Sequence, residues 1–192
     1  MRYFRFSIAL VLIVGVSCYM IAGSGLTKLD DDLCEADVSS SIEALLEEFK
    51  EDNEGRYMPH DVALGGLECQ FFLYFLRDTT GKATQLHFYI QYCADDPLRY
   101  REMFFIIDGT AHHFVPAMSD LKRLKGRYYM ETSDTRLQEA DDALLDSLLE
   151  CRELTIKLCG IDGMGHVIPL HSWQREDFVK TIQLYRLMGG KL

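Results

Sequence analysis

The feature that most constrains the fold is a strand-like stretch from Cys69 to Val115. Four runs of apolar, β-branched and aromatic residues occur there, separated by two turn signals, the segment 79–82 and the dipeptide Asp108-Gly109. Strand-forming runs separated by such turns are typical of antiparallel hairpins. The stretch therefore predicts two β-hairpins in series.

Two registers compete in the first hairpin, and they place different side chains in the core. If Arg77 lies opposite Thr84, one face is apolar throughout. That face comprises Cys69, Phe71, Leu73, Phe75, Leu86, Phe88, Ile90 and Tyr92. A shift by one residue would pair Cys69 with Cys93 but would set the apolar residues against polar ones. Burying each apolar side chain stabilises by roughly 1.5–3 kcal/mol, against about 2–4 kcal/mol for one disulfide, so the first register is favoured.

The opposite face of this hairpin is the candidate binding surface, because aromatic rings with amide and imidazole groups give large contact area with few rotors. Its residues are Phe72, Tyr74, His87, Tyr89 and Gln91, flanked by Gln70 and Gln85. The alternative is that a helix, for instance Trp173 to Met188, covers this face as a second core layer. Solvent exposure of Tyr74 and Tyr89 distinguishes the two interpretations, since burial of both would remove the site.

In the second hairpin, a two-residue turn pairs Phe105 with His112 and Phe104 with His113. The adjacent histidines then point to opposite faces of the sheet. The chain contains no His-x-Glu, His-Glu-x-x-His or Cys-x-x-Cys spacing of the kind that metal sites use. We therefore expect neither a metal site nor a cofactor.

The rest of the chain predicts three amphipathic helices and further strands. Capping boxes or cap residues followed by apolar stripes start the helices at Ser40, Thr135 and Ser172. Strands are expected at Arg127–Glu131, Leu154–Cys159 and Val167–Leu170, a helical turn at Met118–Lys125 and a loop or an irregular edge segment at Arg56–Gly66. The predicted fold is α+β, an antiparallel sheet of about five to seven strands built from hairpins with three helices, in one globular domain over 39–192.

The glycine-rich segment Gly160 to Gly165 is interpreted as a hairpin turn. It follows a strand, as a phosphate-binding loop would, but it lacks the Lys-Ser/Thr ending and leads into a strand rather than a helix. Without a helix N-terminus, no dipole would stabilise an anion there.

The first 24 residues have the layout of an export signal. Arg2 and Arg5 precede an apolar run, Phe6 to Ala22, which ends in small residues. This length is also at the short end of what spans a bilayer, so a retained anchor is the alternative. Cys18 resembles the site at which bacterial lipoproteins are cut and acylated, although Gly15 stands where that pattern has leucine. Residues 25–38 are interpreted as an acidic tether, and membrane contact is expected only through residues 1–24.

The charge of the exported part limits its partners. Without Arg2 and Arg5 the chain has 18 basic residues against 30 acidic ones, a net charge of −12. Such a surface repels nucleic acid and anionic lipid and favours a basic or neutral protein of the cell envelope. We expect a periplasmic, cell-surface or membrane-anchored location.

Five cysteines lie beyond Cys18, an odd number for an oxidising compartment. Cys151 and Cys159 are the nearest pair in sequence, and a turn between them would allow a disulfide. Catalytic motifs such as Gly-x-Ser-x-Gly are absent from the sequence. The leading hypothesis is a noncatalytic binding domain. The alternatives are a hydrolase or redox enzyme using Cys151 or Cys159 with a histidine, and a structural part of a larger envelope complex.

Overall fold

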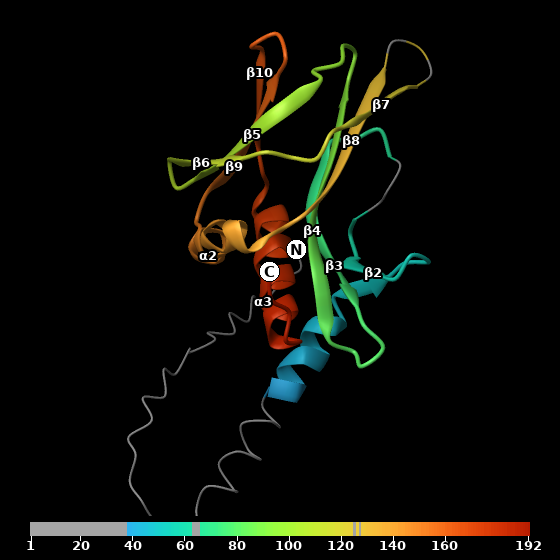
Figure 1. Cartoon of the computed structure of the whole chain (residues 1–192), viewed down its shortest axis with the longest axis vertical. Helices are drawn as coiled ribbons and strands as arrows, with labels where there is room; N and C mark the ends of the chain where they lie inside the picture. Colours follow the sequence, from blue (N-terminus) through green and yellow to red (C-terminus); the bar gives the residue numbers. More distant parts are fainter. Residues whose placement is uncertain (1–37, 63–65, 125, 127) are drawn as a thin grey trace, which may run out of the picture.

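The computed structural model describes residues 38–62, 66–124, 126 and 128–192, and it confirms the predicted α+β class (Figure 1). The described strands form two antiparallel sheets. One sheet has six strands in the order β1-β2-β3-β4-β8-β7, and the other has four in the order β10-β9-β5-β6. The two predicted hairpins therefore belong to different sheets.

The strands of the six-stranded sheet are β1 (Phe49–Glu51), β2 (Arg56–Pro59), β3 (Gln70–Arg77), β4 (Ala83–Ala94), β7 (Asp120–Arg123) and β8 (Tyr129–Arg136). Those of the four-stranded sheet are β5 (Tyr100–Ile107), β6 (Thr110–Phe114), β9 (Leu154–Gly160) and β10 (Gly165–Pro169). The helices are a first helix over 38–46, α2 (Asp142–Glu150) after the 3-10 turn η1 (Glu139–Asp141), and α3 (Ser172–Leu187).

The segments predicted as an export signal and most of the acidic tether, with Cys18 and Cys34, lie outside the described residues. Within the described part of the chain, every helix is too short or too polar to cross a membrane.

The register of the first hairpin is confirmed over most of its length. Phe71 pairs with Ile90, Leu73 with Phe88 and Phe75 with Leu86. A bulge then shifts the pairing, so that Arg77 lies opposite Ala83 and not opposite Thr84 as predicted. Gln85 is the extra residue on β4. Its φ of +48° lies in the left-handed region, and one such unpaired residue bends the strand. Sequence periodicity alone does not reveal such an insertion.

The predicted turn and pairing of the second hairpin are confirmed. Phe105 pairs with His112 and Phe104 with His113. The turn residues Asp108 and Gly109 have φ of +47° and +83°, the positive values that a two-residue hairpin turn of this kind requires.

The expectations for short edge segments were wrong. The predicted loop from Arg56 contains β2, and the predicted helical turn at Met118–Lys125 contains β7. All four residues of β7 are exposed, so its sequence shows no alternation of apolar and polar positions. Strands of this kind form because a neighbour offers free hydrogen-bonding groups, here β8.

Two helix starts also differ from prediction. Thr135 lies in β8, which runs on to Arg136, and the cap is formed by Gln138 with Asp141. The N-cap of α3 is His171, whose N–H donates to the Gln174 side chain over 3.0 Å. The predicted hairpin turn at Gly160–Gly165 is confirmed by the antiparallel pairing of β9 with β10.

The main core lies between the two sheets and α3. Phe88 of β4 packs against Phe105 of β5 and Phe178 of α3, with ring centroids 5.1 and 5.8 Å apart. Phe75 of β3 packs against Tyr185 of α3 at 6.0 Å. The predicted core face of the first hairpin is therefore the face that α3 and the second sheet cover.

Candidate functional site

The face predicted as a binding surface is largely closed. Phe72, Tyr74 and Gln91 are 3%, 4% and 0% exposed, whereas His87 and Tyr89 are half-buried. The helix proposed as an alternative cover does not do this, because α3 packs on the other face of the hairpin. The prediction of a broad open surface is thus replaced by a covered face with two partly accessible residues.

This face is closed by a side chain of β2, the strand beside β3 in the same sheet, and by the chain that follows β2. Met58 of β2 forms a small buried cluster with Phe72 and Tyr74, and Val62 packs against the cluster. The Gln91 side-chain amide donates two hydrogen bonds of 2.9 Å, to the carbonyls of Gly66 and Glu68. This segment was interpreted as a loop, and its packing on the sheet carries no periodic signal in the sequence.

Next to this cover, the exposed Asp134 joins two of the predicted site residues. Tyr74 donates its hydroxyl to one carboxylate oxygen over 2.5 Å, and His87 Nδ1 lies 2.8 Å from the other. The Tyr74 and His87 rings stack with centroids 4.9 Å apart. Burial raises the pKa of Asp134, but the hydrogen bonds from His87 and Tyr74 outweigh it and leave the pKa below its usual range.

Asp134 was missed because the strand that carries it was predicted to end at Glu131. In the structure β8 continues, and Asp134 pairs with Tyr89 of β4. The pKa of Tyr74 is raised, first by burial and then by its hydrogen bond to Asp134. A tyrosine that stays protonated and a carboxylate that stays ionised form a stable donor–acceptor pair, and this network therefore rigidifies the outer face.

A pocket opens at the edge of the covered face, and Gln70 and Phe72 form part of its wall. It has a volume of about 330 Å³. We call it the acidic pocket. Its lining residues are Asp61, Val62, Glu68, Cys69, Gln70, Phe71, Phe72, Ile168, Pro169, His171, Trp173, Gln174 and Asp177. The pocket thus lies where the segment after β2, the start of β3, the end of β10 and the start of α3 meet.

Three carboxylates line the acidic pocket, namely Asp61, Glu68 and Asp177, and none of the described residues lining it is a lysine or an arginine. Burial raises the pKa of Asp177 to about 6, despite the nearby ammonium of Lys180. Lys180 forms an ion pair with Glu48. A carboxylate with a raised pKa lacks sufficient stabilisation of its charged form, and an added cation would supply it.

An accessible aromatic residue stands beside these carboxylates. Trp173 is 50% exposed, and its ring is nearly parallel to that of His171, with 14° between the planes. Both residues lie at the start of α3 and line the pocket. A large exposed indole next to carboxylates is suited to a cation, because cations are attracted to the face of an aromatic ring.

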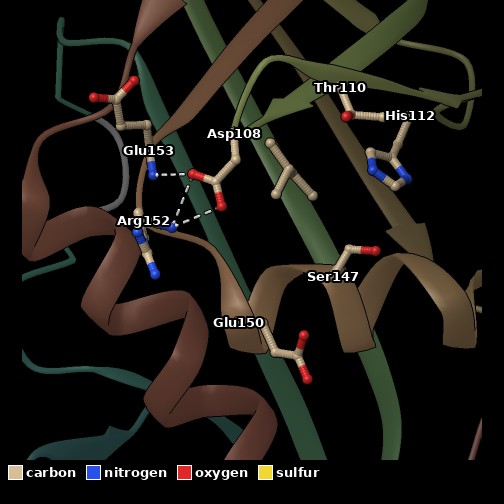
Figure 2. Close-up of a pocket in the computed structure, with 8 residues that line it drawn as sticks. Asp108, Thr110, His112, Ser147, Glu150, Arg152 and Glu153 are labelled. Carbon is tan, nitrogen blue, oxygen red and sulfur yellow. Dashed lines mark hydrogen bonds between the residues drawn. The ribbon is translucent and has the colours of Figure 1, made fainter.

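A second hollow lies between the β5–β6 turn and α2 (Figure 2). The Asp108 carboxylate projects there and accepts hydrogen bonds from the backbone N–H groups of Arg152 and Glu153, at 2.8 to 3.2 Å. Ser147 and Glu150 project from α2 (Figure 2). Because its central carboxylate ties a hairpin turn to the start of β9, we assign this hollow a structural role.

The predicted disulfide does not form. Cys151 and Cys159 are both free thiols. Cys151 is the C-cap of α2 and Cys159 is near the far end of β9, an extended strand that rises about 3.3 Å per residue and holds them apart. Burial raises the pKa of the Cys151 thiol, the opposite of what the enzyme hypothesis requires of a nucleophile. Cys69 and Cys93, which the register argument left unpaired, are also free.

Comparisons of the chain with protein-family models, with curated proteins and with solved structures find no match.

Proposed function

We propose that the chain is an exported or membrane-anchored, noncatalytic binding domain of the cell envelope, and that its acidic pocket holds a basic side chain of a partner protein. The observation that carries the proposal is the raised pKa of Asp177 in a pocket lined by three carboxylates. The net charge of −12 on the exported part also favours a basic partner. The export signal or membrane anchor predicted over residues 1–24 supports the location.

Arginine suits the pocket better than lysine. Its planar guanidinium stacks on aromatic rings, is more weakly hydrated than an ammonium and donates to several acceptors at once. Trp173 offers an accessible ring, and Asp61, Glu68 and Asp177 offer carboxylate oxygens around the pocket.

The test uses blocked tripeptides and measures binding by isothermal titration calorimetry or by NMR chemical shifts. The probe is acetyl-Gly-Arg-Gly-amide, and the matched controls carry lysine or glutamine in place of arginine. We expect saturable binding of the arginine peptide, weaker binding of the lysine peptide and none of the glutamine peptide.

The matched protein variants are Asp177→Asn and Asp162→Asn. Asp162 is an exposed carboxylate in the β9–β10 turn and does not line the pocket. Removing a charged partner of a hydrogen-bonded cation costs about 1.5–3 kcal/mol, so Asp177→Asn should weaken binding by at least tenfold, with no change for Asp162→Asn. Equal affinity of both variants for the arginine peptide would refute the assignment of the pocket.

A further inference from the structure

The strand β10 forms a free edge of the four-stranded sheet. It stands at one end of the order β10-β9-β5-β6, and among the described strands it pairs only with β9. From β10 the chain runs directly into α3 (Figure 1). The unpaired backbone groups along such an edge can bind another extended chain.

The hydrogen bonds of the β9–β10 hairpin show which backbone groups of β10 point outward. At the turn, the Gly160 N–H donates to the Met164 carbonyl over 2.8 Å, and a second bond beyond the other end of β10 has the same parity. Hydrogen-bonded pairs alternate with non-hydrogen-bonded pairs in an antiparallel ladder, so the even-numbered residues of β10 bond to β9. The backbone groups of Gly165, Val167 and Pro169 therefore point away from β9. Within the part of the chain that the structure describes, they make no hydrogen bond.

The residues of β10 leave this edge open. Pro169 has no N–H, and at an outward position its ring removes no hydrogen bond from the ladder, which is where strands tolerate proline. β10 contains no lysine or arginine. By contrast, β7, an edge strand of the other sheet, has three charged residues among its four. Charged side chains discourage pairing with another chain, so β10 is the more open of these two edges.

The end of β10 leads into the acidic pocket. Ile168 and Pro169 line this pocket, and among the described edge strands only β10 does so. Further along the hairpin, Val167 and Met164 are 55% and 58% exposed. An extended chain beside β10 would therefore meet backbone hydrogen-bonding groups, exposed apolar side chains and, at one end, the three carboxylates of the pocket.

We propose that the partner of the acidic pocket is an extended segment that pairs antiparallel with β10 and carries its arginine at the end that reaches Pro169. This inference rests on the proposed function, because the arginine is the side chain assigned to the acidic pocket. The residue opposite Val167 hydrogen-bonds through its backbone, and its apolar side chain lies on the same face of the sheet as that of Val167. Antiparallel pairing is favoured because it is slightly more stable per residue than parallel pairing.

A second copy of the chain fits this edge less well than a basic partner. Two β10 strands could pair with each other, but β10 has no lysine or arginine to place among the carboxylates. Each copy of the exported part also has a net charge of −12, so two copies repel each other. Analytical ultracentrifugation tests this alternative, and a dimer that Val167→Pro dissociates would overturn the proposal.

The experiment titrates the exported part of the chain with blocked peptides in a calorimeter. The probe is acetyl-Arg-Thr-Val-Thr-Val-Thr-amide, whose two valine backbones face β10 when its arginine lies opposite Pro169. We expect it to bind about tenfold more tightly than acetyl-Gly-Arg-Gly-amide, because main-chain hydrogen bonds add affinity. Methyl groups on the backbone nitrogens of both valines should abolish this gain, whereas methyl groups on the second and fourth residues should preserve it. Equal affinity of the two methylated peptides would overturn the proposal.

The outcomes separate strand pairing from the proposed function of the pocket. Binding of the hexapeptide no tighter than that of the arginine tripeptide would refute strand pairing and leave the pocket assignment standing. Failure of both peptides to bind would refute the pocket assignment, and strand pairing with it.

The protein variants are Val167→Pro and, as the matched control, Val167→Thr. Proline removes one outward N–H and no bond to β9, so the fold should tolerate it while affinity for the hexapeptide falls about tenfold. Threonine keeps the N–H and should keep the affinity, and the arginine tripeptide should bind both variants equally. In the unmodified chain, the hexapeptide should slow hydrogen exchange of the Val167 amide. Unchanged exchange at this amide, or unchanged affinity in Val167→Pro, would contradict the proposal.

Discussion

The two faces of the first hairpin are built from the same two strands, β3 and β4, yet they are closed in different ways. The inner face packs mainly through apolar side chains and lies under α3 and the second sheet. The outer face is closed by Met58 of the neighbouring strand β2 and by the chain that follows β2, and it carries the polar network of Tyr74, His87 and Asp134. At its margin the acidic pocket opens.

The difference shows where a domain of this kind can place a site. A face covered by a helix and a second sheet becomes core along its whole length. A face covered by a short segment is closed in the middle by a small cluster, and cavities form where the segment ends. The proposed binding residues therefore lie at the edge of the predicted surface rather than at its centre.

The largest expected effect is on the inner face. Phe88 has a buried ring that contacts Phe105, Phe114 and Phe178. Replacing it with alanine leaves a cavity among these rings, and the free energy of unfolding should fall by about 3–5 kcal/mol. Chemical denaturation measures this, with Tyr89→Phe on the outer face as the control, for which we expect less than about 1 kcal/mol. A loss at Phe88 no greater than that at Tyr89 would contradict the assignment of the two faces.

A smaller effect is expected from the polar network. Tyr74→Phe removes one hydrogen bond to the exposed Asp134 carboxylate, which should destabilise by about 0.5–1.5 kcal/mol at neutral pH. Because the folded-state pKa of Asp134 is lowered, its contribution is present above the unfolded pKa of about 3.9 and disappears as the pH falls through the folded value. Thermal unfolding of wild type and Asp134→Asn from pH 7 to pH 3 should converge at the acidic end; a gap that stays constant with pH would show that the charge of Asp134 does not matter.

The smallest stability effect, of opposite sign, is expected in the acidic pocket. The pKa of Asp177 is about 6 in the folded protein, so the folded state binds more protons than the unfolded state between about pH 4 and 6, and stability falls as the pH rises through this range. Asp177→Asn should therefore stabilise the ligand-free domain at pH 7.5 by on the order of 1 kcal/mol, a value reduced for solvent screening, and have little effect at pH 4. Destabilisation at pH 7.5 would mean that the carboxylate is already stabilised by partners in the fold.

Alternation of apolar residues predicted the pairing of β3 with β4, of β5 with β6 and of β9 with β10, because each strand has a face that must be buried. The same signal fails for β7, which is exposed along its length, and for β2, whose pairing with β3 is short. Division into two sheets depends on contacts between distant segments, such as β5 with β9. Local patterns carry no information about such contacts.

The candidate sites show the same limit. The predicted residues Phe72, Tyr74, His87, Tyr89 and Gln91 do share one face. Asp134 and Asp177 were missed because each reaches its position through tertiary packing, one on a strand longer than its apolar pattern and the other on a helix turn that meets the segment after β2. Trp173 was assigned to a covering helix, and its exposure could not be read from the helix pattern.

The central claim, that the acidic pocket takes an arginine side chain, is tested most directly by the pKa of Asp177 itself. It is measured by a carbon-13 NMR titration of the side-chain carboxyl group, without peptide and with saturating acetyl-Gly-Arg-Gly-amide. The account predicts a pKa of about 6 in the free domain and a fall toward the ordinary value of about 4 in the complex, since a bound guanidinium stabilises the carboxylate. A pKa that stays at about 6 with the peptide present would contradict it.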